Sequence, residues 1–408
     1  MILRIGARAE SRLLGDVLRM AGNPPVRIVL EGGASAVPPG GEWRFTMRVR
    51  DRLTLLRMLA DPEFGFGEEF SRGRVTVEGD LAALCREIYT AARRGRGPGW
   101  VAGLLSRWLR LTQAASPRGA WSNIHRHYDL PAEFYRLWLD SEMIYTSAWF
   151  PHSGATLEDA QRAKMERVCR KLALESGDRV VDAGCGWGAL ALYMARHYDA
   201  RVRAFNLSHE QVEYARRRAA REGLAGQVEF VEDDYRNVGG RFDAFASIGM
   251  LEHVGAEHYP ELARMLRRWL GESGRGLLHF IGRSRPEPLS PWIRRRIFPG
   301  AYVPALSEAL RVLEQGDYAV MDVENLRSHY ARTLACWRQR FEAAQAEAAR
   351  MLDGELLRAW RLYLAGSQAA FQTGNLQLYQ VLFAGRECRR RLWTREWAAR
   401  EEESASRI

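Results

Sequence analysis

The stretch VVDAGCGWG, residues 180–188, decides the fold class of this 408-residue chain. Its first residues predict a short buried strand, and ALALYMARHY (189–198) follows with helical spacing. Between them, Gly184, Gly186 and Gly188 let the backbone turn sharply and approach a ligand, where a Cβ would collide. A strand, a glycine-rich turn and a helix in this order are typical of the first unit of a parallel α/β sheet that binds a nucleotide.

The segments after the glycine turn predict the rest of that sheet. RVRAFNLS (201–208), GQVEFVEDDYRNV (226–238) and FDAFASIGMLEHV (242–254) each contain a strand-like apolar run, and helical runs separate them. This alternation indicates parallel strands joined by crossover helices. We therefore predict an α/β protein with a Rossmann-like core. Past about residue 284, we expect charged and aromatic helices.

Two features favour S-adenosylmethionine over a dinucleotide as the ligand. The glycine spacing is GxGxG behind Asp182 rather than GxGxxG, and RVRAFNLS ends without the acidic residue that would hold the ribose of NAD. In GQVEFVEDDYRNV (226–238), which follows, an adenine ring can stack on the aromatic residue, and the amino group of the adenine can donate a hydrogen bond to Asp234. These observations predict a class I S-adenosylmethionine-dependent methyltransferase.

The residues before this core predict a smaller domain. Three strand-like runs, RIVLEGG, EWRFTMRVR and RGRVTVEGD, are flanked by helical runs, which is typical of an α+β domain. RRGRGPG (93–99) has the composition of a linker, and VAGLLSRWLRLTQAA (101–115) is amphipathic, as expected of a helix that packs between domains or lies on a membrane. The predicted parts are an N-terminal domain at 1–95, a linker helix at 96–122, a catalytic domain at 123–390 and a charged tail at 391–408.

Composition excludes several classes of protein. The five cysteines include no CxxC pair, which disfavours a disulfide framework and a zinc site, so we predict no metal. No apolar stretch approaches the roughly 20 residues that span a bilayer, and the N-terminus does not resemble a signal peptide, so we expect a cytoplasmic protein. The net charge of +10 comes from arginine, since lysine occurs only at Lys164 and Lys171. A GC-rich genome explains this bias, but an arginine-rich surface also attracts phosphate.

Over roughly residues 120–385 the sequence resembles the cyclopropane-fatty-acyl-phospholipid synthases and the related mycolic acid cyclopropane synthases. The matching segments are NIHRHYDLPAEFYRLWLDSEMIYTSAWF (123–150), VVDAGCGWGALALYMA (180–195), NLSHEQVEYA (206–215), SIGMLEHVGAEHYPE (247–261), GLLHFIG (276–282), RIFPGAYVPAL (296–306), HYARTLACWRQRF (329–341) and GNLQLYQVLF (374–383). DPEFGFGEEFSRGRVTVEGDL (61–81) is also similar to the lipid-handling N-terminal domain of the bacterial synthases.

The resemblance implies which residues hold S-adenosylmethionine. Tyr145 and Thr146 would close over its methionine part, and the glycine turn would hold its carboxylate and ribose. A polar group after the second strand would replace the missing acid, and an acid with an aromatic residue would flank the adenine. The implied cofactor residues are Tyr145, Thr146, Asp182, Gly184, Gly186, Gly188, Asn206, Leu207, Ser208, Gln211, Asp234 and Tyr235.

The resemblance also implies a reaction. In the family a bicarbonate ion sits beside the transferred methyl group, and Glu252, His279, Ile281 and Tyr330 match the residues that hold it, with Ser147 at the position of a cysteine. The double bond of an unsaturated phospholipid acyl chain would attack the methyl group. Bicarbonate would stabilise the resulting cation and remove a proton so that a cyclopropane ring closes. Without the resemblance, Glu252 would be an ordinary helix-start carboxylate and His279 a satisfied strand histidine. Core packing of Tyr330 is an alternative even with the resemblance.

Ser147 leaves the product open. The family motif Tyr-Ser-Cys reads Tyr145-Thr146-Ser147, and although a hydroxyl can still donate to an anion, a shifted base would remove a different proton. The product would then be a methyl- or methylene-branched chain, including precursors of furan fatty acids. An amine N-methyltransferase shares the same core, and a lipid-binding protein without activity also fits Ser147. Asn23-Pro24-Pro25-Val26 superficially resembles the NPP motif of DNA methyltransferases that modify amino groups. That motif must lie at the end of the fourth strand, and this segment lies far from it, so we expect no nucleic-acid partner.

We expect the N-terminal domain and the arginines to bind an anionic membrane surface. Each exposed arginine contributes on the order of 1 kcal/mol near such a surface, so a few suffice for reversible binding. The protein would then lie peripherally at the inner membrane face, with an acyl chain entering an apolar tunnel. Members of the family can pair as dimers, so the resemblance allows a homodimer.

Overall fold

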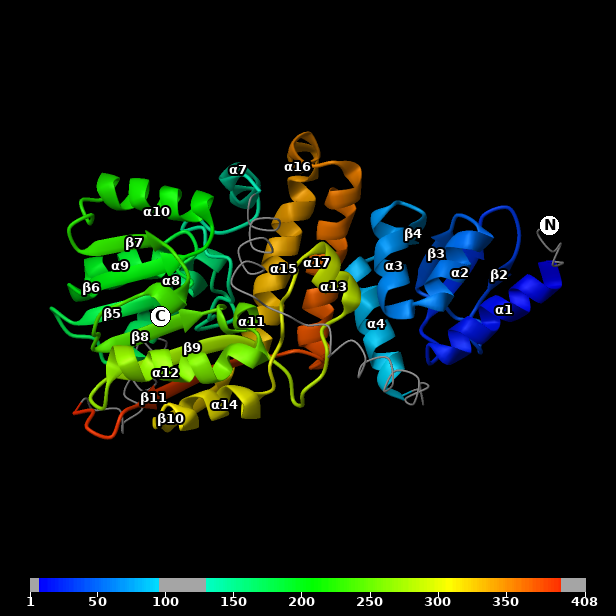
Figure 1. Cartoon of the computed structure of the whole chain (residues 1–408). Helices are drawn as coiled ribbons and strands as arrows, with labels where there is room; N and C mark the ends of the chain where they lie inside the picture. The colour runs from blue at the N-terminus through cyan, green and yellow to red at the C-terminus, as the bar shows by residue number, and fades with distance from the viewer. Residues whose placement is uncertain (1–6, 95–129, 390–408) are drawn as a thin grey trace. The chain divides into compact units, whose positions relative to one another are not determined.

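The computed structural model describes residues 7–94 and 130–389 (Figure 1). The predicted linker helix at 96–122 and charged tail at 391–408 lie outside these residues. The chain divides into two compact units. Among the described residues, the first, here the small-sheet unit, comprises residues 7–94, 288–297 and 334–375, and the second, the large-sheet unit, comprises 130–287, 298–333 and 376–389. Two segments from the range predicted as catalytic therefore belong to the same unit as the N-terminal strands.

The large-sheet unit contains a seven-stranded sheet in the order β10-β11-β9-β8-β5-β6-β7. Its strands are β5 (Arg179–Ala183), β6 (Arg201–Asn206), β7 (Val228–Glu232), β8 (Ala244–Ile248), β9 (Arg275–Gly282), β10 (Ala319–Asn325) and β11 (Gln377–Ala384). β5 to β9 are parallel, whereas β11 is antiparallel to β9 and β10 to β11. The predicted α/β Rossmann-like fold is confirmed, but the expectation of helices past residue 284 is incomplete because β10 and β11 lie there.

Helices cover both faces of this sheet. They are α7 (Ala132–Arg136), α8 (Leu157–Lys171), α9 (Ala189–Tyr198), α10 (His209–Arg221), α11 (Leu251–Val254), α12 (Tyr259–Leu270), α14 (Leu306–Gln315) and the first part of α15 (Arg327–Ala343). Successive strand residues face opposite sides. Accordingly, Val180 packs in a core cluster with Leu192 of α9, and Val181 packs in a second cluster with Trp269 of α12. Burial on both faces explains why the central strand β8, AFASI, is almost entirely apolar.

The small-sheet unit contains a four-stranded sheet in the order β2-β1-β3-β4. Its elements are α1 (Ala7–Met20), β1 (Val26–Leu30), β2 (Ser35–Ala36), β3 (Phe45–Val49), α2 (Arg52–Ala60), α3 (Pro62–Ser71), β4 (Val75–Glu78), α4 (Leu81–Arg94), α13 (Pro291–Arg296), the last part of α15, α16 (Gln345–Met351) and α17 (Gly354–Thr373). The N-terminal residues thus contain both helices and strands. α17 packs against α3 and α4, which brings a late segment of the chain to an early one.

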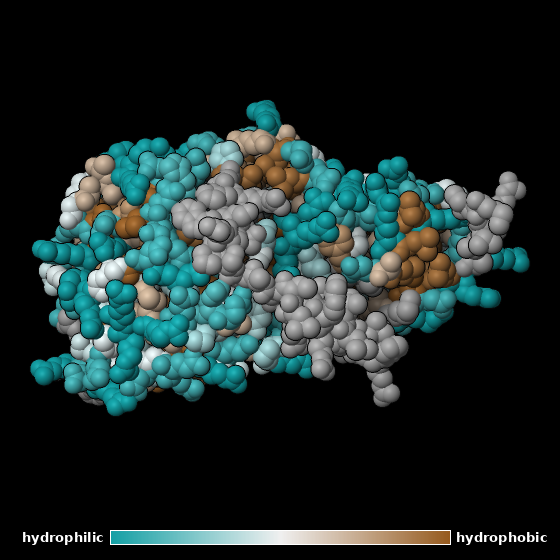
Figure 2. All heavy atoms as spheres, viewed as in Figure 1, coloured by the Kyte–Doolittle hydropathy of each residue, from teal (hydrophilic) through white to brown (hydrophobic). Residues whose placement is uncertain are grey.

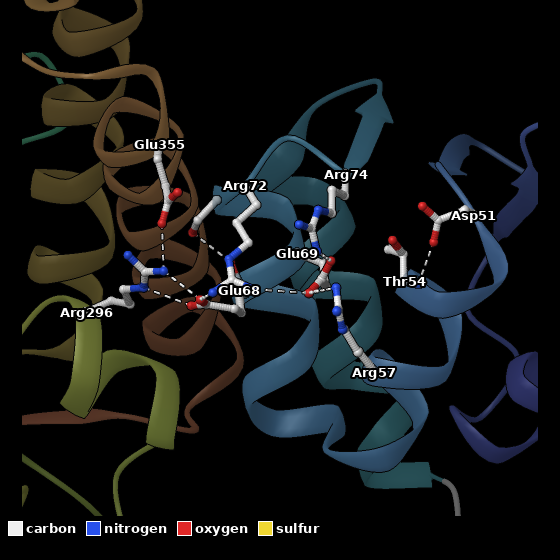
Figure 3. A network of polar contacts seen from close by, with 11 residues as sticks. Asp51, Thr54, Arg57, Glu68, Glu69, Arg72, Arg74, Arg296 and Glu355 are labelled. Atoms are coloured by element: carbon white, nitrogen blue, oxygen red, sulfur yellow. Dashed lines mark hydrogen bonds and ion pairs between the residues drawn. The ribbon is translucent and has the colours of Figure 1, made fainter.

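An ion-pair network joins three segments of the small-sheet unit (Figure 3). Glu68 of α3 accepts two hydrogen bonds from Arg296 of α13, at 2.6 and 2.8 Å, and one N–O contact of 2.7 Å from Arg72. Arg296 also pairs with Glu355 of α17 at 2.6 Å. The hydrogen bonds from Arg296 hold the pKa of Glu68 below its usual value. Bidentate pairing of this kind fixes geometry, which explains why segments distant in sequence share one unit.

Candidate active site at the carboxyl ends of the parallel strands

The glycine turn follows β5 and is tied to the end of β6. The backbone N–H groups of Gly184 and Cys185 both donate to the carbonyl of Phe205, at 3.0 and 3.1 Å. Gly184, Gly186 and Gly188 all have positive φ, of 80°, 55° and 85°. A Cβ on Gly188 would lie 2.7 Å from the Phe230 ring, whereas a Cβ on Gly186 would meet nothing within 4 Å. The absence of a side chain at Gly188 therefore allows Phe230 to pack against the turn, whereas the space beside Gly186 is open.

The four cofactor residues predicted around the end of the second core strand, Asn206, Leu207, Ser208 and Gln211, lie between the last residue of β6 and the first turn of α10. The Asn206 side chain donates to Gln211 Oε1 at 2.5 Å, and its Oδ1 accepts the backbone N–H of Leu207 at 2.8 Å. Ser208 and Gln211 are buried, and Ser208 Oγ has no hydrogen-bond partner within the described residues. The end of β6 thus presents a fixed amide group and a buried hydroxyl instead of a carboxylate.

Asp234 and Tyr235 follow β7, and both are buried. Each carboxylate oxygen of Asp234 accepts a hydrogen bond from the Arg236 guanidinium, at 2.7 Å. The Arg236 guanidinium also lies 5.3 Å from the centre of the Tyr235 ring. Two carboxylate oxygens offer about four acceptor positions, so Asp234 can still accept a further donor such as an adenine amino group. Tyr235 packs in the core cluster on the α12 side, and burial raises the pKa of its hydroxyl.

Asp182 and Lys164 form a buried pair of charges beneath the glycine turn. Burial raises the pKa of Asp182 to about 7, and the positive charge of Lys164 opposes this rise. Burial likewise lowers the pKa of Lys164 to about 7, against the charges of Asp140 and Asp182. Lys164 Nζ donates to Thr146 Oγ1 at 2.8 Å. Lys164 and Asp140 were not predicted as site residues; the one available signal was that the chain has only two lysines among 60 basic residues.

The segment that contains Tyr145, Thr146 and Ser147 runs beside the end of β8. A Cβ on Gly249, the residue after β8, would lie 3.3 Å from Thr146 Cγ2. The Thr146 carbonyl accepts a hydrogen bond from Gln161 Nε2 of α8 at 3.0 Å, and the Tyr145 ring packs edge-on to Trp138 at 5.3 Å. Ser147 is buried, and its hydroxyl donates to the carbonyl of Ala148 at 2.9 Å. Aromatic packing and the amide of Gln161 therefore fix the predicted cofactor lid.

Glu252 lies in α11, directly after β8, and is 6% exposed. Its Oε1 accepts the backbone N–H of Ile281, at the end of β9, at 2.6 Å. Its Oε2 has no partner in the part of the chain that the structure describes. Burial raises the pKa of Glu252 to about 7, so near neutral pH this carboxyl is populated in both its charged and neutral forms. The structure therefore brings together Glu252 and Ile281, two of the residues that the sequence suggested for the ion site.

His279 lies on β9, in register with Ile248 of β8 and Gln380 of β11. Its Nδ1 is 3.1 Å from Gln380 Nε2, and burial lowers its pKa to about 3, so the imidazole is neutral. With the amide donating to Nδ1, the proton of the neutral ring is on Nε2. That Nε2 is buried and has no partner among the described residues. His279 is thus a fixed hydrogen-bond donor, and Gln380, which was not predicted, sets its tautomer.

Tyr330 is 7% exposed and lies in the first turn of α15. Its neighbours on that helix hold the segment after Ser147. The backbone N–H of Ala148 donates to Thr333 Oγ1 and that of Phe150 donates to His329 Nδ1, both at 3.0 Å. The helix that carries Tyr330 therefore packs directly against the residues that follow Ser147.

Several residues on the strands of this sheet, or just after them, carry buried polar atoms that have no partner among the described residues. They are Asp182 Oδ2, Ser208 Oγ, the Tyr235 hydroxyl, Ser247 Oγ, Glu252 Oε2, His279 Nε2 and Gln380 Oε1. Each lies on, or next to, the end of a strand near the glycine turn or on the adjoining antiparallel strand. Because folded proteins satisfy nearly all buried polar groups, such a group of atoms indicates a polar ligand. Within the described ranges, no cluster of three or more His, Cys, Asp or Glu residues is placed to hold a metal.

The sequence and the fold are similar to those of several known proteins. The family model described as mycolic acid cyclopropane synthetase matches residues 115–381. A probable fatty acid methyltransferase of Pseudomonas putida is 36% identical over 78% of this chain and 81% of its own length. The cyclopropane-fatty-acyl-phospholipid synthase of Escherichia coli K12 is 32% identical over 91% of this chain and 93% of its own. The crystal structure of the mycolic acid cyclopropane synthase CmaA1 complexed with SAH and CTAB has a TM-score of 0.62 and 29% identity, over 64% of this chain and 97% of that chain.

Proposed function

Because the chain belongs to the mycolic acid cyclopropane synthetase family and is an S-adenosylmethionine-dependent methyltransferase, we propose that it methylates the double bond of an unsaturated phospholipid acyl chain, which then closes to a cyclopropane. The observation that carries this proposal is that Glu252 and His279 each carry a buried polar atom without a partner among the described residues, with Glu252 just after β8 and His279 on β9 opposite Ile248, the last residue of β8. The similarity to a probable fatty acid methyltransferase and to a cyclopropane-fatty-acyl-phospholipid synthase supports an acyl chain as the acceptor.

The residues at the strand ends fit S-adenosylmethionine. When bound, this cofactor supplies an electrophilic methyl group on a positively charged sulfur. Gly186 leaves open space at the turn, and Ser208 and Asp182 carry buried oxygens that need a partner. Asn206 is oriented by its bonds to Gln211 and Leu207, so its position is set before the cofactor arrives. A pre-oriented polar site of this kind binds without a large ordering cost.

We propose that Glu252, His279, Ile281, Tyr330 and Ser147 surround a bicarbonate ion. This ion would supply a base that removes a proton from the methylated chain. The Nε2–H of His279 is a fixed donor toward it, and Glu252 near its pKa can carry the proton that a bicarbonate oxygen accepts. The Ile281 N–H holds Glu252 in place. Placing donors where negative charge must reside, inside a buried site, is an effective form of electrostatic catalysis.

A methyl- or methylene-branched product is the second candidate, and the contact of Ser147 favours it. The Ser147 hydroxyl donates to the Ala148 carbonyl, so its proton is already used. A base that lacks this donor can settle closer to another carbon of the cation and remove a different proton. The similarity to a probable fatty acid methyltransferase is consistent with such an outcome.

The product of the purified protein distinguishes these candidates. Full-length protein would be incubated with methyl-labelled S-adenosylmethionine and vesicles of unsaturated phospholipid, with and without bicarbonate, and the acyl chains analysed by mass spectrometry and NMR. A gain of one methylene with cyclopropane signals, dependent on bicarbonate, is the expected result. An olefinic or branched methyl signal would instead assign the second candidate. Absence of label from the lipid would contradict both.

We further propose that the small-sheet unit binds an anionic membrane surface. Its exposed apolar residues include Leu53 and Leu56 of α2 and Trp43, and brown apolar surface is visible over this unit at the right of Figure 2. The Arg27 guanidinium lies 5.5 Å from the centre of the Trp43 ring. Arginine beside exposed leucine and tryptophan suits the boundary between lipid headgroups and acyl chains. No helix in the described residues is both long and apolar enough to cross a bilayer.

A further inference from the structure

The small-sheet unit contains a cavity of about 250 Å³ that the proposed reaction does not use. Thr76 and Val77 of β4 line it, together with three arginines, Arg338 of α15 and Arg358 and Arg361 of α17. We call this cavity the arginine pocket. Drug-sized ligands occupy roughly 300–1,000 Å³, so this pocket suits a smaller group.

The arginines outnumber the carboxylates that line the pocket. Arg338 donates to Asp80 at 2.9 Å, and Arg361 donates through Nε to Glu342 at 2.9 Å. Arg358 instead donates through Nε to the backbone carbonyl of Ser71, at 2.8 Å. Three positive charges thus face two negative charges, and the lining carries a net positive charge.

The unused donors belong to Arg358 and Arg361. Within the described part of the chain, the hydrogen bonds of both side chains use only Nε, which leaves their terminal nitrogens available. The Arg358 guanidinium is also held in place by close backbone: a Cβ on Gly73 would lie 3.1 Å from its Cζ, and a Cβ on Gly354 would lie 3.2 Å from Nη1. A guanidinium that is already fixed loses little further freedom when an anion binds.

Part of the pocket lining, here called the apolar wall, consists of apolar residues, and β4 adds an open strand edge. Phe70, Val75 and Leu81 are buried there. Among the described residues, β4 is the last strand of its sheet and pairs only with β3, so alternate N–H groups on its outer side have no strand partner there. The pocket therefore combines guanidinium donors, an unpaired strand edge and an apolar wall.

We propose that the arginine pocket binds the phosphate of a phosphate ester, with the terminal nitrogens of Arg358 and Arg361 as its donors. Arginine forks match the oxygens of phosphate, and the apolar wall accommodates the carbon attached to the ester. Two sources share this chemistry, the headgroup of a glycerophospholipid and a free phosphate compound. This proposal concerns a pocket that the methyl transfer does not use, so phosphate binding can be measured without the reaction.

Titration calorimetry of the full-length protein tests this proposal with three probes: inorganic phosphate, glycerol 3-phosphate, and dihexanoyl phosphatidylglycerol below its micelle concentration. Saturable binding of the phospholipid at least tenfold tighter than of the other two would assign a lipid headgroup. Equal or tighter binding of the two small probes would assign a free phosphate compound. Absence of saturable binding for all three would overturn the proposal.

Matched variants locate the site. Arg358→Gln is the first choice because Arg358 has no carboxylate partner in the structure, so its loss leaves no buried charge unpaired. Arg361→Gln is the second variant, in case the first fails to fold. Arg350→Gln is the control, since Arg350 is exposed on α16, outside the pocket lining, and the charge change is the same. We expect each pocket variant to raise the Kd for phosphate about tenfold or more, with Arg350→Gln unchanged. An equal loss in Arg350→Gln, or none in both pocket variants, would overturn the assignment.

Discussion

Glu252 Oε1 accepts the backbone N–H of Ile281 at 2.6 Å, which joins the helix after β8 to the end of β9. This one bond leaves the second carboxylate oxygen buried without a partner among the described residues. The main chain thus determines where the acid of the proposed ion site lies, and only one of its oxygens remains for a ligand. Three of the predictions below depend on how buried charges are held in this region.

Glu252→Gln should lower kcat by on the order of a hundredfold or more, with the affinity for S-adenosylmethionine nearly unchanged. Glutamine keeps the acceptor for the Ile281 N–H but cannot carry the exchangeable proton proposed for the ion site. Steady-state kinetics with labelled cofactor and calorimetric titration of the cofactor would measure the two effects separately. Glu257→Gln, at an exposed position on the next turn, is the control and should retain activity. Full activity of Glu252→Gln would rule out the proposed role.

The pH dependence of stability should also change in Glu252→Gln. Burial raises the pKa of Glu252 from 4.5 to about 7, so the folded state prefers the neutral carboxyl. Its contribution to stability is therefore complete below about pH 4.5 and is lost as the pH rises through about 7. The free energy of unfolding, measured with urea at pH 5 and pH 8, should fall by up to about 3 kcal/mol more in the wild type than in the variant. Equal pH dependence in the two proteins would show that Glu252 is charged throughout.

Two glycines of the turn should respond differently to alanine. Gly188→Ala places a methyl group 2.7 Å from the Phe230 ring at positive φ, so overpacking adds to backbone strain, and we expect a loss of about 2–5 kcal/mol. Gly186→Ala meets no atom within 4 Å, so only backbone strain of about 1–2 kcal/mol should remain. Urea denaturation gives both values. Calorimetry should show weaker cofactor binding in Gly186→Ala because its methyl group would occupy the open side of the turn, and unchanged binding would mean that the cofactor does not approach Gly186.

The glycine turn could be predicted from sequence because its causes are local. Strand, turn and helix are adjacent in the chain, and the same positions have positive φ in the structure. The pairing of His279 with Gln380 is different, since it joins residues 101 positions apart through the antiparallel register of β9 and β11. No periodicity in the sequence shows that register. In addition, β10 and β11, which both lie after residue 284, were not predicted as strands.

Sequence patterns also do not show which segments of the chain make up the small-sheet unit. Arg296 and Glu68, which are 228 positions apart, are joined by two hydrogen bonds, and this contact brings α13 to α3. In the sequence Arg296 is one of three consecutive arginines, with nothing to mark it as a partner of Glu68. Lys164 was likewise noted only for its rarity, because its role depends on burial beside Asp140 and Asp182.

Lys164 should act on the cofactor through Thr146. Lys164→Met removes the donor to Thr146 Oγ1, and Thr146→Val removes the acceptor, so each should raise the Kd for S-adenosylmethionine about tenfold. The double variant should be little worse than Lys164→Met alone, because Thr146→Val removes only a bond that Lys164→Met has already broken. Arg162→Met, an exposed position on the same helix, is the control and should bind normally. Fully additive losses would show that the two side chains act independently.

Membrane binding should depend on Leu53 and Leu56, which are 55% and 57% exposed and lie three residues apart on α2, hence on one face. Burying a leucine in lipid contributes about 1.5 kcal/mol or more, so Leu53→Ser with Leu56→Ser should weaken binding to anionic vesicles about a hundredfold. Vesicle sedimentation measures this loss. Val320→Ser with Met321→Ser removes comparable exposed apolar residues from β10 of the large-sheet unit and is the matched control. A loss in the control alone would move the membrane contact to the large-sheet unit.

If arginines also contribute to membrane binding, added salt should weaken the binding of the wild-type protein. Salt-independent binding that still requires the two leucines would indicate insertion without electrostatic attraction.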